Sequence, residues 1–285
     1  MSKLFHTPLF SRLAVLLVVI ITLMFLIGWP ANPPISAQVS KATGTARPPA
    51  LNLSNQLQST VSVTGVTHSS TGAVLIGCSG SGTLVSADGL ILTNAHLVRP
   101  SAACALDSIL IGLPIVTGQA PVATYYADLV EANVGWDLAV LRISRTLDGR
   151  AIDPGTLAVP YVALGDSDTL KLDDTLTTLG YPGGSDPTLT SNSAITRVGT
   201  ISNFMDEAFV GAHAWIKIAA HLPGGLSGGG AYNDQGELVG IATVVPAPGQ
   251  AQACRTIQDT NGDGRIDNQD TCIPTAGPDS MALVG

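Results

Sequence analysis

The sequence predicts an all-β protein built from two antiparallel barrels, and three observations support this prediction. Short runs rich in Val, Ile, Leu and Thr alternate with turns, in a chain of 285 residues that contains 31 glycines and 18 prolines. Helical periodicity is weak throughout these runs. The runs also fall into two clusters, within residues 61–143 and 175–245, which a looser segment at 144–160 connects. Two clusters of short strands joined by a connector are typical of paired antiparallel barrels.

The N-terminus carries a predicted export signal. Lys3 and Arg12 come before an apolar run at residues 13–27, and Ile-Ser-Ala at 35–37 offers a small-residue cleavage site. This run is slightly long for a cleaved signal peptide and slightly short for a membrane-spanning anchor, so residues 1–37 are interpreted as one or the other; a buried core helix is the remaining alternative. We therefore expect a secreted or extracytoplasmic protein that contacts a membrane only through this segment.

Composition divides the rest of the chain into three parts. Residues 38–58 are rich in Pro, Ala, Ser and Thr without an amphipathic period, which predicts a flexible spacer. Residues 59–248 hold both strand clusters and form the predicted main domain, and residues 249–285 shift to Asp, Asn and Gly and form a predicted short tail. The net charge of −8 leaves no basic surface for binding nucleic acid. The oligomeric state is not legible in the sequence.

Four cysteines are consistent with an oxidising compartment. They allow three pairings, of which the local one, Cys78–Cys104 and Cys254–Cys272, is favoured because each pair brackets a motif described below. A metal site built from all four cysteines is the alternative, but no Cys-x-x-Cys spacing supports it.

Three residues combine into a candidate catalytic triad. His96 ends the segment Thr93-Asn94-Ala95-His96 after a β-prone run, Asp137 opens an otherwise apolar strand at 138–143, and Ser227 lies in a glycine cluster at 222–230. A serine hydroxyl is a weak nucleophile that needs an adjacent base, and a carboxylate fixes the tautomer of that base.

The glycines around Ser227 allow a tight turn in which several amides point at one place. The N–H groups of Gly225 and Ser227 are therefore the expected oxyanion donors. The competing interpretations are a core histidine at 96, a strand cap at 137 and a plain loop around 227. Asp107 and Asp128 are weaker candidates for the acid, because neither opens the apolar strand.

At these residues the sequence resembles the trypsin-like serine peptidases of the bacterial HtrA-type branch. The matching blocks are residues 80–98, 137–143, 163–182 and 223–241, in the family order His, Asp, Ser. The resemblance implies two perpendicular six-stranded barrels with the triad in the cleft between them. It also implies a serine endopeptidase that acts on polypeptide substrates and needs no cofactor for catalysis.

The sequence departs from this family in three ways. The family usually has Pro-Gly-Asn-Ser-Gly-Gly-Pro, whereas this chain has Pro223-Gly-Gly-Leu-Ser227 followed by three glycines and no proline. The segment after Pro248 is too short for the PDZ domain that many relatives carry, so we expect none. A Cys78–Cys104 bond around His96 is more like the secreted trypsin group. His221 lies where the family places residues near the primary specificity pocket, which makes it a candidate substrate contact.

Residues 259–270 fit a twelve-residue calcium loop. Hard oxygen ligands at this spacing suit Ca²⁺, and Gly264 lies at the sharp turn. Asp270 replaces the usual glutamate at the last position, and the loop resembles those of dockerins and thrombospondin type-3 repeats. The alternative is a polar surface loop. The candidate ligands are Asp259, Asn261, Asp263, Arg265 through its carbonyl, Asp267 and Asp270.

Serine endopeptidase is therefore the leading functional hypothesis. A catalytically weak or inactive homologue that binds peptides is the first alternative, and the altered loop before Ser227 is the one feature in its favour. A calcium-dependent structural or adhesion module is the second alternative.

Overall fold

A computed structural model describes most of the predicted main domain. All of its described residues belong to the unit Leu51–Gly285. The predicted export signal, most of the spacer and the predicted calcium loop lie outside the described residues. Within the described part of the chain, no helix is long and apolar enough to cross a membrane. The described ranges are 53–101, 104–182, 193–207 and 211–243, with short segments at 254–255, 273–274 and 280–283.

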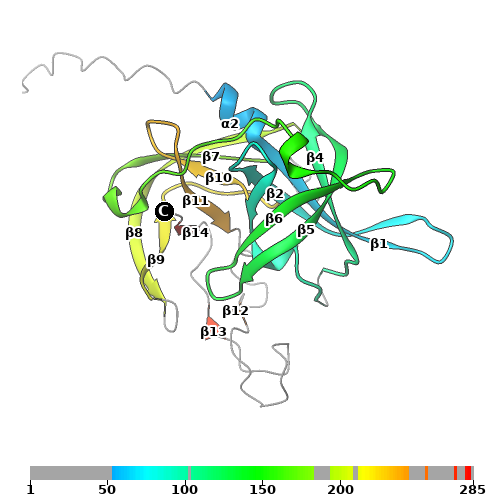
Figure 1. Ribbon diagram of the computed structural model, residues 1–285. Helices are drawn as coiled ribbons and strands as arrows, with labels where there is room; N and C mark the ends of the chain where they lie inside the picture. The colour runs from blue at the N-terminus through cyan, green and yellow to red at the C-terminus, as the bar shows by residue number, and fades with distance from the viewer. Residues whose placement is uncertain are drawn as a thin grey trace, which may run out of the picture. The chain divides into compact units, whose positions relative to one another are not determined.

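Six antiparallel strands form the first barrel, in the spatial order β1-β2-β3-β6-β5-β4 (Figure 1). Burial alternates along β3 and β6, as expected where one face of a strand points into a barrel. Ile91, Ile111 and Leu141 are fully buried in its core. The strands are β1 (Thr60–His68), β2 (Val74–Leu84), β3 (Leu90–Thr93), β4 (Ser108–Pro114), β5 (Pro121–Asn133) and β6 (Leu138–Thr146).

A second closed barrel follows, in the order β10-β11-β14-β9-β8-β7. The strands β10 and β11 are buried along their whole length. The predicted fold of two antiparallel six-stranded barrels is therefore confirmed. The strands are β7 (Thr175–Gly180), β8 (Ile195–Glu207), β9 (Gly211–Ile218), β10 (Gly230–Tyr232), β11 (Leu238–Thr243) and β14 (Ser280–Leu283).

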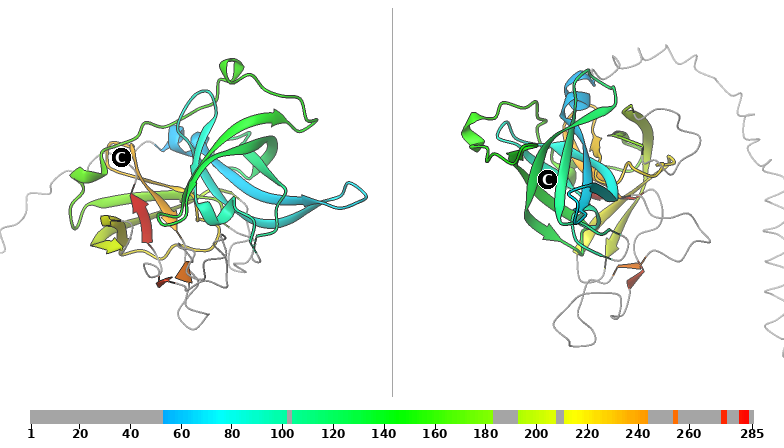
Figure 2. Two further views of the ribbon diagram at one scale, coloured as in Figure 1. Left: turned by 60° about the horizontal axis from the view of Figure 1, so that its bottom comes forward. Right: turned by 90° about the vertical axis from the view of Figure 1, so that its right-hand side faces the viewer.

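The strand β14 comes from the segment that the sequence suggested to be a tail. It pairs with β11 on one side and with β9 on the other, so it closes the second barrel (Figure 2). The connection from β11 to β14 contains a small two-stranded sheet, β12 (Cys254–Arg255) with β13 (Ile273–Pro274), in which Cys254 lies opposite Pro274. The region after residue 248 is thus partly an excursion between two neighbouring barrel strands.

The two barrels pack against each other through an apolar cluster. Leu179, Tyr232 and Ile241 of the second barrel are fully buried, and Leu92 and Leu138 of the first barrel pack against them. The short helix α2 (Ser54–Ser59) joins this cluster through Leu57, and the buried Gln56 donates from Nε2 to the Gly236 carbonyl at 2.8 Å. Three short 3₁₀ segments complete the described elements: η1 (Ala95–Leu97), η2 (Pro154–Thr156) and η3 (Ser167–Thr169).

Candidate active site

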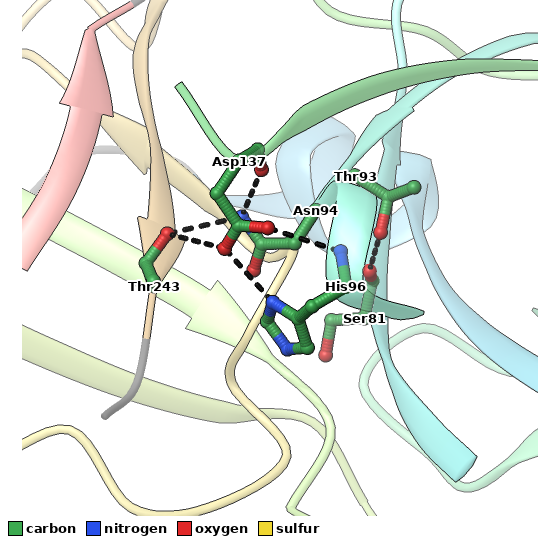
Figure 3. A network of polar contacts seen from close by, with 6 residues as sticks. All are labelled: Ser81, Thr93, Asn94, His96, Asp137 and Thr243. Atoms are coloured by element: carbon green, nitrogen blue, oxygen red, sulfur yellow. Dashed lines mark hydrogen bonds and ion pairs between the residues drawn. The ribbon is translucent and has the colours of Figure 1, made fainter. Parts of the chain in front are cut away.

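His96 and Asp137 meet beside the junction of the two barrels (Figure 3). His96 lies in η1 directly after β3, and Asp137 lies directly before β6, the strand that pairs with β3. Asp137 Oδ2 is 2.8 Å from His96 Nδ1, and Asp137 Oδ1 accepts from the His96 backbone amide at 3.0 Å. The carboxylate side chain is 2% exposed and the imidazole 43% exposed. A buried carboxylate therefore holds one nitrogen of a ring that remains accessible.

The backbone of Asp137 adopts a conformation that side-chain-bearing residues seldom use. Its φ is +52°, in the left-handed region. Its carbonyl accepts from the Ala95 amide at 3.1 Å and from Asn94 Nδ2 at 2.9 Å, and its own amide donates to the Val134 carbonyl at 3.2 Å. Such a conformation persists only where neighbouring groups hold the backbone in place, and these three hydrogen bonds do so here.

Asn94 and Thr243 connect this pair to the second barrel. Asn94 is fully buried, and its Nδ2 donates to Thr243 Oγ1 at 3.0 Å as well as to the Asp137 carbonyl. Because an amide nitrogen can only donate, the Thr243 oxygen accepts this bond and directs its own hydrogen to Asp137 Oδ2, 3.5 Å away. Thr243 was not among the predicted site residues. Its one signal in the sequence is its place as a polar residue at the end of the apolar run that forms β11.

Ser227 lies in a tight loop held between the barrels. The residue is largely buried, at 7% exposure, and its carbonyl accepts from the Ser81 amide of β2 at 2.7 Å. Gly228 has a φ of +84°, and a Cβ there would lie 2.0 Å from the Ser81 carbonyl oxygen. The Gly228 amide donates to the Ala242 carbonyl of β11 at 2.9 Å. Only glycine fits this position without displacing a neighbour.

The loop of Ser227 and the segment of His96 approach the same point of β2. A Cβ on Gly80 would lie 2.4 Å from Leu97 Cδ1 and 2.8 Å from the Ser227 carbonyl oxygen. The residue that follows His96 and the backbone of Ser227 thus pack together over Gly80. Gly225, the other predicted oxyanion donor, lies in the same loop with a φ of +90°.

The predicted disulfide Cys78–Cys104 is present, with the two Cα atoms 5.0 Å apart. Its sulfur atoms lie 3.3 and 3.6 Å from the Leu97 carbonyl oxygen. The bond therefore packs directly against the short 3₁₀ segment that carries His96. The second predicted disulfide, Cys254–Cys272, includes a residue outside the described ranges and stays a prediction.

The alternative carboxylates have other partners. Asp107 accepts from the backbone amide of His68, at 2.9 Å, and from its imidazole, and these bonds hold the pKa of Asp107 below its usual range. Asp128 is 3.5 Å from Arg145. His221, the candidate substrate contact, is exposed six positions before Ser227.

The predicted metal ligands at 259–270 lie outside the described residues. Among the residues that are described, no group of three or more His, Cys, Asp or Glu side chains is placed to hold a metal ion.

Comparisons with known proteins identify the family of this chain. The profile of the trypsin-like peptidase domain matches residues 80–241, from the start of the His96 block to β11. A probable periplasmic serine endoprotease DegP-like of Halomonas elongata is 35% identical over 164 residues, which is 57% of this chain and 28% of that protein. A protein of the same name from Pseudomonas putida is 31% identical over 162 residues, 57% of this chain and 28% of its own length.

The periplasmic pH-dependent serine endoprotease DegQ of Escherichia coli is 30% identical over 173 residues, 60% of this chain and 32% of that protein. This chain thus aligns with about a third or less of the length of these relatives. Because the family profile covers more than half of the chain and spans both barrels, the chain belongs to the trypsin-like peptidase family, as its resemblance to the HtrA-type branch predicted.

Proposed function

We propose that this protein is a serine endopeptidase with His96, Asp137 and Ser227 as its catalytic triad. The observation that carries the proposal is the bond between the buried Asp137 carboxylate and Nδ1 of the accessible His96 ring, in a chain of this family. With Nδ1–H donated to the carboxylate, Nε2 holds the lone pair that a general base needs.

The proposed reaction transfers an acyl group in two steps. In the first, Ser227 Oγ attacks the scissile carbonyl carbon while His96 Nε2 accepts the hydroxyl proton, and the resulting tetrahedral oxyanion binds the amides of Gly225 and Ser227. The C–N bond then breaks as His96 returns the proton to the departing amine, which leaves an ester on Ser227. In the second step, water attacks the ester with the same base and releases the carboxylic acid. The chemistry uses no cofactor.

Active-site labelling tests the proposal. A fluorophosphonate probe should label the folded protein, and both Ser227→Ala and His96→Ala should abolish labelling. Asp107→Asn is the matched control, since it alters an exposed carboxylate that also pairs with a histidine. Absence of labelling in a wild-type protein with a cooperative thermal transition would contradict the proposal and favour the first alternative, a peptide-binding homologue without activity.

The substrates are proposed to be extracytoplasmic polypeptides. Relatives that carry the same domain are named periplasmic endoproteases, and the predicted export signal at residues 1–37 points to the same compartment. Expression of the full chain followed by fractionation and mass spectrometry of the N-terminus tests this. A mature N-terminus near residue 38 would support a cleaved signal, and recovery of the intact chain in the cytosol would contradict export.

A calcium site at residues 259–270 is a second, separate proposal. One observation favours it: the pairing of β12 with β13 brings together the two chain segments that flank this stretch. Addition of Ca²⁺ should raise the melting temperature of the wild type and not that of Asp263→Ala. Asp148→Ala, which alters an exposed carboxylate paired with Arg150, is the matched control. Equal melting temperatures with Ca²⁺ and with a chelator would overturn the proposal.

A further inference from the structure

The fully buried Ser81 of β2 makes contacts that reach from the first barrel into the loop of the proposed nucleophile. Its Oγ donates to the Gly225 carbonyl at 2.8 Å, and its backbone amide donates to the Ser227 carbonyl at 2.7 Å. Its Oγ also accepts from the Tyr181 amide at 2.8 Å, at the end of β7. One residue of the first barrel therefore binds three points of the second.

The direction of these bonds is fixed by chemistry. The Tyr181 amide can only donate, so Ser81 Oγ must accept there and has its single hydrogen left for the Gly225 carbonyl. Thr93 Oγ1 in turn donates to the Ser81 carbonyl at 2.7 Å, three positions before His96. Every polar group of Ser81 is thus used in the junction between the His96 segment and the Ser227 loop.

The two carbonyls that Ser81 holds belong to the residues whose amides are the proposed oxyanion donors, and along the chain they flank the Ser227 amide. A peptide group is planar, so fixing the Gly225 carbonyl fixes the plane between Gly225 and Leu226, and fixing the Ser227 carbonyl fixes the plane between Ser227 and Gly228. Gly225 and Gly228 have positive φ values of +90° and +84° and would otherwise be free to rotate. The peptide group that carries the Ser227 amide thus lies between two planes that Ser81 holds, and the Gly225 amide adjoins the first of these planes.

Other amides of the loop are used within the second barrel. Those of Leu226, Gly228 and Gly229 donate to the carbonyls of Pro223, Ala242 and Leu226. These bonds fix the conformation of the turn within the second barrel. The bonds from Ser81 connect the turn to the first barrel, where His96 lies.

We propose that Ser81 is a positioning residue that aligns the oxyanion-binding amides of Gly225 and Ser227 with the His96 side of the site. The proposal rests on the proposed endopeptidase function. It also accounts for how a loop with an additional residue between Pro223 and Ser227 keeps a defined orientation. Ser81 does not touch the reacting atoms and acts through the backbone of the loop.

The test is steady-state kinetics on a peptide substrate with Ser81→Ala. We expect kcat/KM to fall about 10- to 100-fold, almost entirely in kcat, because misaligned donors weaken binding of the transition state and not of the substrate. Affinity for a peptide aldehyde, whose adduct places an oxyanion in the same position, should fall in parallel. The apparent pKa in the pH profile of kcat/KM should stay unchanged, because the His96–Asp137 bond is not altered.

Ser59→Ala is the matched control, since Ser59 is equally buried and its hydroxyl has no hydrogen-bond partner. If Ser81→Ala does not fold, Ser81→Thr and Ser81→Val decide, because they share one shape and only threonine keeps the hydroxyl. Activity in the threonine variant alone supports the proposal. Full activity of Ser81→Ala, equal activity of the threonine and valine variants, or a shifted pH profile would overturn it. A wild-type protein that neither cleaves peptide nor reacts with fluorophosphonate would instead refute the endopeptidase function itself.

Discussion

The half of the site that carries His96 is held by side-chain hydrogen bonds, whereas the half that carries Ser227 is held by backbone groups and by the absence of side chains. In the first half, the Asp137 carboxylate bonds to the His96 imidazole, and the Asn94 side chain donates to the Asp137 carbonyl. In the second half, carbonyls are tied to Ser81 and glycines occupy positions where a methyl group has no room. Removing one polar atom at Asp137 or Asn94 should therefore damage the first half. The second half should respond to added volume at its glycines as well as to loss of the Ser81 hydroxyl.

The largest effect is expected for Asp137→Asn. The side-chain oxygen of the new amide must face the His96 backbone amide, which can only donate, so its NH₂ group faces His96 Nδ1. This pairing favours the tautomer that carries its proton on Nε2, which cannot accept a proton from Ser227. We expect kcat to fall about 10⁴-fold while the fold is retained. Peptide hydrolysis and far-UV circular dichroism check both parts, and a decrease below about tenfold would contradict the assigned role.

Gly228→Ala tests the other half through volume. A Cβ at Gly228 would lie 2.0 Å from the Ser81 carbonyl oxygen and 2.4 Å from Thr93 Oγ1, and the φ of +84° disfavours a side chain. We expect loss of fluorophosphonate labelling and a large fall in melting temperature. Gly149→Ala is the matched control, since Gly149 has the same φ of +84° with nothing within 4 Å of the added atom. It should cost only about 1 kcal/mol of unfolding free energy. Similar behaviour of the two variants would show that the close packing around Gly228 does not matter.

Asn94→Ala tests the link between the halves. It removes the donors to the Asp137 carbonyl and to Thr243 Oγ1, and leaves those buried acceptors short of a partner. We expect a loss of about 1–3 kcal/mol in unfolding free energy and about a tenfold fall in kcat. Asn55→Ala is the control, because Asn55 is exposed and makes one bond to the Tyr161 carbonyl. Urea unfolding and steady-state kinetics measure the two effects. Unchanged kcat in a destabilised Asn94 variant would limit this residue to a structural role.

The smallest effect should appear only in alkali. Burial raises the pKa of Tyr181 and of Tyr232 to about 12, from an ordinary value of 10.0. The fold favours the neutral phenol, so this stability is fully present below pH 10 and is lost as the pH rises toward 12. Each such tyrosine should contribute about 1.4 kcal/mol of lost stability per pH unit in that window. Urea unfolding at pH 9 and 11 should show a shallower loss for Tyr232→Phe than for wild type, and an identical loss would contradict the assignment.

The sequence can suggest the residues of the candidate site that have a local signal. His96, Asp137 and Ser227 stand out because each is a polar residue in an apolar or glycine-rich segment. Asn94 and Thr243 are separated by 149 positions, and Ser81 and Gly225 by 144, so their pairing depends on how two barrels dock. No local pattern reports such contacts. The strand β14 was not predicted for a related reason. Its four residues are too few to show a strand pattern, and they form a strand by pairing with β11 and β9.

The placement of β14 also sets an order for assembly. All six strands of the first barrel lie within residues 60–146, so this barrel has its full set of strands once that stretch has left the ribosome. The second barrel needs Ser280–Leu283 between β11 and β9. Because the chain is synthesised from its N-terminus, the barrel that carries His96 has all of its strands before the second barrel, which holds the Ser227 loop, has its last strand. The half of the site that carries the proposed nucleophile is therefore the last to have its full set of strands.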